Sequence, residues 1–239
     1  MKDRQRPPVL IIGAHRSGTS ATARALELLG LQIGQRLDSH REPRQLQKLH
    51  EEYLRKVGAA WHNPEPFLKW TESDEGKHDC ISHLEKNIRQ NFGQILGYQR
   101  NPKGLWLRAR LKFGAAWGWK EPRTTLFAPA WLEIFRGARI VHVVRDPQAA
   151  ASSLRERELK FQAAGDPPTA NLSNLDYCKQ LIQIYLAAGE RLANSSNYQK
   201  IRFEQLQANP PDALASLGQF CGLRFGTAQL RAAAATIRQ

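Results

Sequence analysis

The chain has 239 residues, a length typical of a single domain. Hydrophobic residues make up 41% and charged residues 24%, which excludes fibrous and wholly disordered classes. With 35 Lys and Arg against 22 Asp and Glu, the formal net charge is +13, so we expect the protein to attract anions. The cations are spread along the chain without a nucleic-acid-binding signature, which favours an enzyme with anionic ligands over a nucleic-acid-binding protein.

The chain lacks the marks of membrane insertion, secretion and metal binding by cysteines. No apolar run approaches the roughly 20 residues that cross a bilayer. Residues 1–8 are charged and lead into no secretory segment, so we expect a frayed start and a cytoplasmic protein. Cys80, Cys178 and Cys221 are far apart and form no Cys-x-x-Cys pair, so we expect reduced, mostly buried thiols and no zinc site.

Apolar patterning predicts strands that alternate with helices. In chain order we predict a strand over 9–12, a helix over 21–31, a helix around 81–95, a strand over 140–144, a helix over 148–159 that Asp146 and Pro147 begin, a helix over 175–192, a strand over 200–203 and a helix over 211–221. Such alternation indicates an α/β fold, a three-layer sandwich with a central parallel sheet. We treat residues 1–239 as one domain.

The predicted domain contains a less regular part. Residues 35–75 and 97–119 are rich in Trp, His, Pro and Gly, and we expect irregular structure there. An insertion within about 35–119 is a suitable place for acceptor binding, because binding residues concentrate on loops.

A Gly-rich loop separates the first predicted strand from the first helix. Gly13 to Ser20 has the glycine spacing of a phosphate-binding loop, in which backbone N–H groups and a helix N-terminus hold an anion. Thr19 occupies the position of the lysine of ATP- and GTP-splitting enzymes, and the cation, Arg16, comes three residues earlier. The next buried strand ends in Arg145. The pattern predicts a phosphate-bearing ligand and argues against an ordinary nucleoside triphosphatase.

Four motifs, in the same order, resemble those of sulfotransferases that use 3′-phosphoadenosine 5′-phosphosulfate (PAPS). Residues 16–20 match the loop [KR]-S-G-T-[ST] after the first strand. Arg145 and Ser153 match a strand ending in Arg with a Ser eight residues later. Residues 120–123 match the Lys-acid-Pro motif of bacterial and tyrosylprotein members, and residues 203–223 resemble a late Tyr-Glu-Asp-Leu…Pro…Phe-Leu-Gly-Leu stretch.

This resemblance covers about residues 8–225 and implies the P-loop NTPase-like sulfotransferase fold, with PAPS as co-substrate and adenosine 3′,5′-bisphosphate (PAP) as product. The donor-binding residues it implies are His15, Arg16, Ser17, Gly18, Thr19, Ser20, Arg145 and Ser153. The loop holds the 5′-phosphate and Arg145 with Ser153 holds the 3′-phosphate, while Arg16 and Lys120 stabilise the leaving oxygen and the sulfuryl group. Because a sulfuryl group carries less charge than a phosphoryl group, we expect no metal requirement.

The general base is a His or carboxylate within hydrogen-bond reach of the acceptor. Cytosolic sulfotransferases use a His, whereas tyrosylprotein members use a Glu that follows the loop. The corresponding zone here contains Asp38, His40 and Glu42, and all three are candidates. We take Glu42, with Arg16 and Lys120, as the catalytic set. His50 and His62 lie further along the chain.

Two departures from the family pattern keep other functions open. Phe203 stands where the family has Tyr, and residues 224–239 lack the Arg-Lys-Gly loop with which cytosolic members grip the 3′-phosphate. One alternative is a nucleotide or small-molecule kinase with an atypical loop, for which Asp146 is the metal-organising acid. The other is a non-catalytic module that binds phosphates or sugars.

The acceptor is not evident from the sequence. We expect a small molecule or a carbohydrate, with no nucleic-acid partner and no stable membrane insertion. Trp61, Trp70 and Trp106 are either core residues or platforms for sugar rings. No pattern indicates an oligomeric state.

Overall fold

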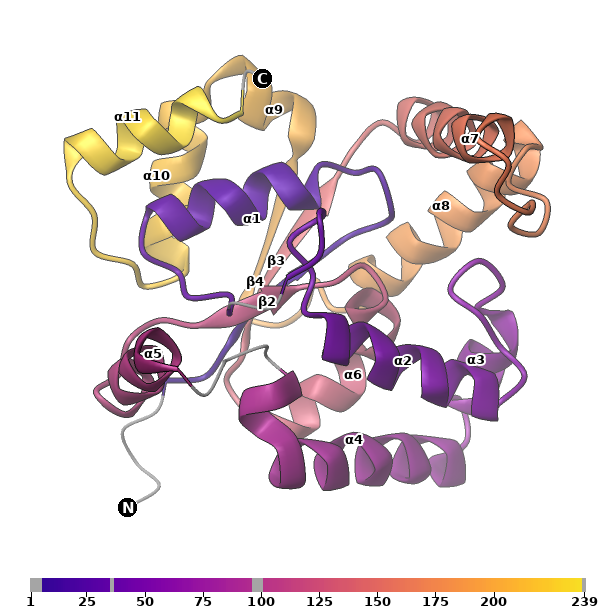
Figure 1. The fold of residues 1–239 in the computed structure, drawn as a ribbon, viewed down its shortest axis with the longest axis horizontal. Coiled ribbons are helices and arrows are strands. Elements are labelled where there is room, and N and C mark those ends of the chain that lie inside the picture. Colours follow the sequence, from indigo (N-terminus) through magenta and orange to yellow (C-terminus); the bar gives the residue numbers. More distant parts are fainter. Residues whose placement is uncertain (1–5, 35–36, 96–100, 238–239) are drawn as a thin grey trace.

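A computed structural model describes residues 6–34, 37–95 and 101–237 of the chain (Figure 1). Four parallel strands form one sheet in the order β2-β1-β3-β4. The strands are β1 Val9–Ile12, β2 Gly118–Lys120, β3 Arg139–Val144 and β4 Tyr198–Arg202. The predicted α/β class with a central parallel sheet is therefore confirmed.

Helices flank the sheet in the described ranges. They are α1 Thr19–Leu28, α2 Arg44–Lys56, α3 Glu65–Trp70, α4 Asp74–Ile95, α5 Pro102–Lys112, α6 Thr124–Ile134, α7 Pro147–Ala163, α8 Leu175–Glu190, α9 Phe203–Ala208, α10 Pro210–Phe220 and α11 Thr227–Ala235. No helix in these ranges has the length and apolar character needed to span a membrane. All three cysteines are buried with free thiols, as expected.

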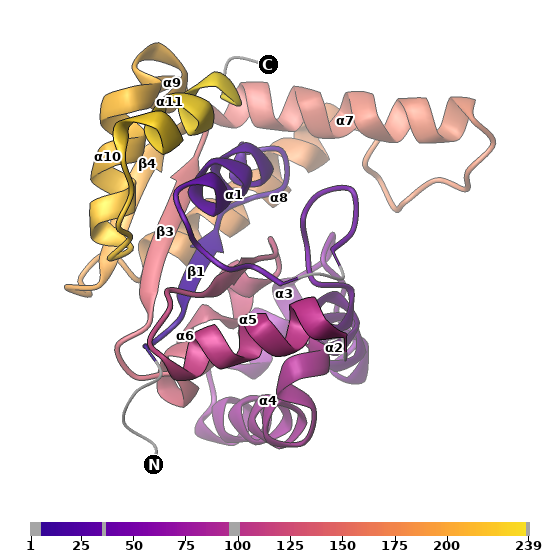
Figure 2. The same ribbon diagram turned by 60° about the vertical axis from the view of Figure 1, so that its left-hand side comes forward.

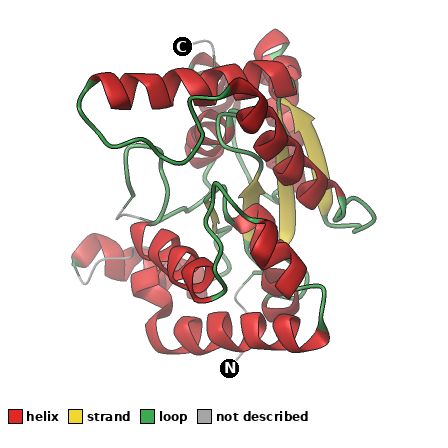
Figure 3. Ribbon diagram, turned by 90° about the vertical axis from the view of Figure 1, so that its right-hand side faces the viewer, coloured by secondary structure: helices red, strands yellow, loops and turns green. Residues whose placement is uncertain are grey.

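The two faces of the sheet pack into separate apolar cores. Leu10 and Ile12 of β1 join a core built with α2, α4, α6, α7 and α8. Val9 and Ile11 point the other way, into a core with α1, α9, α10 and α11. Figures 1 and 2 show these helix layers on either side of the strands, and Figure 3 shows the strands in yellow among the red helices. The predicted three-layer sandwich follows from this alternation, because successive side chains of a strand face opposite sides.

Residues 44–56, 65–70 and 102–112 correct the expectation of irregular structure, because they form α2, α3 and α5. In α2, Leu46, Leu49 and Tyr53 recur at helical spacing and are buried in the core. The positions between them hold Gln, Lys, Glu and the buried His50, so this polar composition hid a helix that tertiary packing stabilises.

Strand β2 was also not predicted. It has only three residues, and its place depends on the neighbouring β1 strand. A Cβ at Gly118 would lie 1.9 Å from the backbone oxygen of Val9, so glycine permits the close approach of the two strands. At the other edge of the sheet, Phe203 was predicted to end a strand and instead begins α9.

The start of α7 follows the prediction. Asp146 Oδ1 accepts a hydrogen bond from the Ala149 N–H at 2.8 Å, and Pro147 occupies the first turn. An aspartate cap satisfies one of the free N–H groups at the helix start, and proline needs no partner there.

Candidate active site

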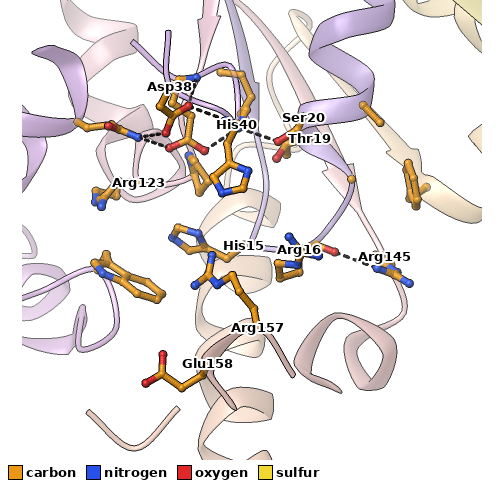
Figure 4. Close-up of a pocket in the computed structure, with 18 of the residues that line it drawn as sticks. His15, Arg16, Thr19, Ser20, Asp38, His40, Arg123, Arg145, Arg157 and Glu158 are labelled. Atoms are coloured by element: carbon orange, nitrogen blue, oxygen red, sulfur yellow. Dashed lines mark hydrogen bonds and ion pairs between the residues drawn. The ribbon is translucent and has the colours of Figure 1, made fainter. Parts of the chain in front are cut away.

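A cavity of about 480 Å³ opens beside the carboxyl ends of the strands (Figure 4). Ligands of open α/β sheets bind at this edge. Of the residues singled out from the sequence, His15, Arg16, Gly18, Thr19, Ser20, Asp38, His40, Glu42, Lys120 and Arg145 line it. Ser17 is buried under the loop and Ser153 reaches the cavity through Arg16, so neither of these two lines it directly.

The loop between β1 and α1 is held from beneath by α6. The Gly13 N–H donates to Thr125 Oγ1 at 2.9 Å. At Gly18 φ is +92°, and a Cβ there would lie 2.2 Å from the ring of Phe203, so only glycine fits. No side chain in the described ranges caps α1, which leaves its first N–H groups to bind an anion.

Two arginines and a serine meet at the outer end of the loop. Arg16 Nε donates to Ser153 Oγ at 3.0 Å, and Arg145 Nη1 donates to the backbone oxygen of Arg16 at 3.2 Å. Among the residues that the structure describes, neither guanidinium is ion-paired. Two unpaired arginines beside a phosphate-type loop make a strongly anion-attracting site.

The late sequence motif supports this end of the site. Val144 lies opposite Arg202 in the sheet, so Arg145 and Phe203 follow at adjacent strand ends. The Arg145 guanidinium lies 5.9 Å from the centre of the Phe203 ring. These contacts explain why residues after β3 and after β4 both carry family-like motifs.

Lys120 and Glu42 form an ion pair on the cavity wall. Lys120 Nζ lies 2.6 Å from Glu42 Oε1 and also donates to Ser20 Oγ at 3.0 Å. The side chains are only 1% and 8% exposed. Burial raises the pKa of Glu42 above its ordinary value, and the charge of Lys120 opposes that rise. A carboxylate with a raised pKa is a better proton acceptor.

Asp38 shapes the loop that presents Glu42. Its Oδ1 accepts hydrogen bonds from the backbone N–H groups of His40 and Glu42, both at 2.8 Å. Gln47 donates to the other oxygen of Asp38 at 2.9 Å and to Glu42 Oε2 at 2.6 Å. His40 is exposed, and partial burial lowers its pKa. Of these three base candidates, only Glu42 contacts Lys120.

His50 lies behind the cavity in a buried network. Its Nδ1 is 2.6 Å from Glu121 Oε2, and its Nε2 accepts from Trp131 Nε1 at 3.1 Å. Arg123 Nη1 lies 2.6 Å from Glu121 Oε1, and its Nη2 lies 2.6 Å from Glu51 Oε1. Burial by itself would raise the pKa of Glu121, but Arg123 and His50 hold that pKa well below its usual range. Neither His50 nor His62 lines the cavity.

Sequence reasoning missed most of the wall opposite Lys120. We call Trp61, Arg157, Glu158, Phe161 and Thr169 the α7 wall. The Arg157 guanidinium lies 5.7 Å from the centre of the Trp61 ring, and its Nε has no hydrogen-bond partner in the part of the chain described. Burial lowers its pKa. The available signal was position, because Arg157 comes one helical turn after Ser153.

His15 joins the loop to this wall. Its ring centre lies 4.4 Å from that of Trp61. Burial, followed by the charges of Arg123 and Arg157, lowers the pKa of His15 well below its ordinary value. The other tryptophans lie elsewhere: Trp70 donates to the Tyr53 hydroxyl at 3.2 Å, and Trp106 is 56% exposed on α5.

Solved structures with the same fold include several sulfotransferases. The sulfotransferase domain of the Synechococcus PCC 7002 olefin synthase has a TM-score of 0.51 at 16% identity and covers 95% of this chain and 78% of that one. Sulfotransferase STF9 from Mycobacterium avium has a TM-score of 0.55 at 15% identity, covering 98% and 69%. Mouse sulfotransferase SULT7A1, complexed with PAP, has a TM-score of 0.52 at 12% identity, covering 97% and 64%. At such identities these likenesses show the fold.

Family membership is shown by comparison of the sequence with family models. A comparison with curated proteins found no relative. A family model described as the sulfotransferase family matches residues 7–227, which is nearly the whole chain. The loop, the strand ends and the cavity described above all lie within this match. The chain therefore belongs to the sulfotransferase family.

Proposed function

We propose that the protein transfers a sulfuryl group from PAPS to a hydroxyl or amine of a small acceptor. The observation that carries the proposal is the position of Lys120 Nζ, between Ser20 in the first turn of α1, just after the loop, and Glu42 of the cavity wall. One buried cation thereby joins a phosphate-binding loop to a carboxylate suited to accept a proton. Family membership and the PAP bound to the mouse relative support PAPS as the donor.

The donor fits the residues at the sheet edge. The uncapped N-terminus of α1 and the hydroxyls of Thr19 and Ser20 suit the 5′-phosphosulfate. The 3′-phosphate takes the Arg145 guanidinium and the Ser153 hydroxyl, which lie together beside the loop through their contacts with Arg16. These two sites explain why the loop carries Arg16 in place of the usual lysine and why a second arginine, Arg145, follows β3 beside it.

The transfer is a single displacement at sulfur. The acceptor oxygen attacks the sulfur, the bond from sulfur to the bridging oxygen of the 5′-phosphate breaks, and PAP leaves. Glu42 takes the proton of the acceptor hydroxyl. Lys120 and Arg16 stabilise the negative charge that develops on the bridging and sulfuryl oxygens. Because these cations are already in place, the charge build-up needs no metal ion in this proposal.

The acceptor enters against the α7 wall. Arg157 is a partly buried guanidinium without an ion-pair partner among the described residues, and Trp61 and Phe161 provide apolar surface beside it. An acceptor with an anionic group next to a ring or apolar part would satisfy both. We therefore include in the proposal a small anionic acceptor, which is compatible with an anionic carbohydrate.

The kinase alternative has less support. It requires an acid at the end of β3 that organises Mg²⁺, and Asp146 is the candidate. The carboxylate of Asp146 instead caps α7, and this residue does not line the cavity. A non-catalytic module would bind the same phosphate-bearing ligand but would form no sulfated product.

Thermal unfolding in the presence of PAP, ADP, and ADP with Mg²⁺ tests the donor. We expect PAP alone to raise the unfolding temperature. Arg145→Ala should weaken PAP binding by roughly 10-fold to 100-fold, since a hydrogen bond to a charged group contributes about 1.5–3 kcal/mol. Arg24→Ala, an exposed arginine of α1, is the matched control. Stabilisation by ADP only with Mg²⁺ would instead support the kinase.

Turnover is tested with PAPS and paired acceptors that differ only in a carboxylate or phosphate group. Mass spectrometry of the products should show a gain of SO₃ on the anionic member of each pair. PAP binding without any sulfated product across the panel would support the non-catalytic module.

A further inference from the structure

Helix α5 is apolar on two opposite sides. Gly104 and Leu111, seven residues apart, are buried on one side. Leu105 and Ala109 are four residues apart and exposed on the other side, and Phe113, four residues further on, is the residue that follows the helix. With about 3.6 residues per turn, these sets occupy opposite faces. The inner face accounts for the packing of α5, whereas Leu105, Ala109 and Phe113 on the outer face stay exposed in the part of the chain that the structure describes.

The outer face carries large apolar side chains that water contacts. Leu105 is 58%, Trp106 56% and Phe113 81% exposed. We call these three residues the α5 patch. Other exposed large apolar residues, such as Leu159 at 38%, are more covered. In Figure 1 α5 lies at the lower left, and in Figure 2, which brings that side forward, none of the labelled helices or strands lies in front of it. Contiguous patches of this kind mark interaction sites.

The charged residues near α5 in the chain are all basic, although Arg89 pairs with Glu85 and Lys120 is buried in its pair with Glu42. Residues 86–120 contain no Asp or Glu, and their cations are Lys86, Arg89, Arg100, Lys103, Arg108, Arg110, Lys112 and Lys120. On α5, Arg110 and Lys112 are exposed, and the Arg110 guanidinium lies 4.8 Å from the centre of the Trp106 ring. Exposed cations therefore border the apolar patch directly.

We infer that α5 binds the surface of an anionic lipid bilayer. Helices that lie in a membrane interface combine an apolar face containing Trp, Phe or Leu with Lys and Arg beside it. Each cation near an anionic bilayer contributes about 1 kcal/mol, and the apolar side chains enter the headgroup region. This peripheral contact requires no membrane-spanning helix and does not depend on the proposed sulfuryl transfer.

Charge decides between a bilayer and other occupants. A second copy of this chain would bring two basic faces together, which like-charge repulsion opposes. A nucleic acid would pair with the cations but would leave Leu105 and Phe113 in contact with water. An anionic bilayer satisfies both features, because it offers negative headgroups above an apolar layer.

Vesicle flotation tests the inference with the full chain. We expect the protein to float with vesicles of equal parts phosphatidylcholine and phosphatidylglycerol, and not with phosphatidylcholine alone. About 1 M NaCl, which shortens the Debye length to about 3 Å, should weaken the binding. The double variant Trp106→Gln/Arg110→Gln should bind anionic vesicles at least about tenfold less.

The matched control is Leu159→Gln/Lys160→Gln, which removes one exposed apolar residue and one exposed cation from α7. It should float like the wild type, and all variants should keep the wild-type unfolding temperature. Equal flotation of the α5 variant and the wild type would overturn the inference, as would wild-type protein that stays unbound. The inference would also be overturned, in favour of a second copy of the chain, by two results together. Light scattering would show a wild-type dimer that Trp106→Gln/Arg110→Gln converts to a monomer, and the wild type would not float with vesicles.

Discussion

Glu42 and Glu121 are both buried carboxylates beside a cation, but they lie in different surroundings. Glu121, behind the cavity, contacts Arg123 and His50 and accepts backbone N–H bonds from Arg123 and Thr124 at 3.2 Å each. Glu42 contacts Lys120 and Gln47 and lines the cavity. The same burial leaves the two pKa values shifted in opposite directions.

In the proposed function, this difference separates a carboxylate that stabilises the fold from one that accepts a proton. Where charged and hydrogen-bonding partners outweigh desolvation, as around Glu121, the anion is stable and has no reason to take a proton. Where desolvation prevails, as at Glu42, the carboxylate accepts a proton more readily. Replacing one carboxylate at a time separates the two effects.

The largest expected change in stability follows removal of Glu121. Glu121→Ala leaves Arg123 buried without its main partner, and breaking such a pair costs about 3–5 kcal/mol. Urea unfolding measures the loss. Glu52→Ala, at an exposed position of α2, should change the free energy of unfolding by less than about 0.5 kcal/mol. A similarly small loss of unfolding free energy for Glu121→Ala would contradict the claim that Glu121 stabilises the fold.

The largest expected change in activity follows Glu42→Gln. The amide keeps the shape of the side chain but cannot take the acceptor's proton, so kcat should fall about 10²–10⁴-fold. PAP affinity should stay near that of the wild type, because Glu42 acts on the acceptor. Asp38→Asn, in the same loop, is the companion variant. Wild-type kcat in Glu42→Gln would assign the base elsewhere, with His40 the next residue to replace.

The pH dependence distinguishes the two glutamates. Because the pKa of Glu42 is raised above 4.5, the base is lost as pH falls through that raised value, and kcat/KM should drop about tenfold per pH unit on a limb above pH 4.5. The pKa of Glu121 is lowered, so its stabilisation is fully present above pH 4.5 and is lost only as pH falls through its folded value. Steady-state rates and circular dichroism at each pH measure both. Activity that stays constant down to pH 4.5 would contradict the assignment of Glu42.

The smallest effect concerns an exposed carboxylate. Asp146→Ala removes the N-cap of α7 and should cost about 0.5–2 kcal/mol, measured by urea unfolding. Asp166→Ala, an exposed loop residue whose carboxylate caps no helix, should cost less. The kinase alternative would be supported if the wild type bound a nucleotide in a Mg²⁺-dependent way and Asp146→Ala abolished that binding.

The loop side of the cavity was more predictable from the sequence than the α7 wall. Gly13, Arg16 and Gly18 belong to one short segment whose conformation depends on neighbours in the chain, so its spacing indicated a phosphate loop. For Arg157 the one local signal, its place one helical turn after Ser153, is weak, since a cation on a long charged helix is usually solvated. Its place in the cavity depends on how α7 packs across α8 and Trp61.

The sequence by itself determined the parallel α/β architecture, the phosphate loop and the two arginines beside it, because these features arise from periodicity and short-range geometry. Only the tertiary structure decided that Lys120 meets Glu42, 78 residues away, and that Glu121 is enclosed by Arg123 and His50. The physical reason is that burial and charge pairing depend on the whole packed fold. Two glutamates that look alike in the chain thereby acquire opposite chemistry.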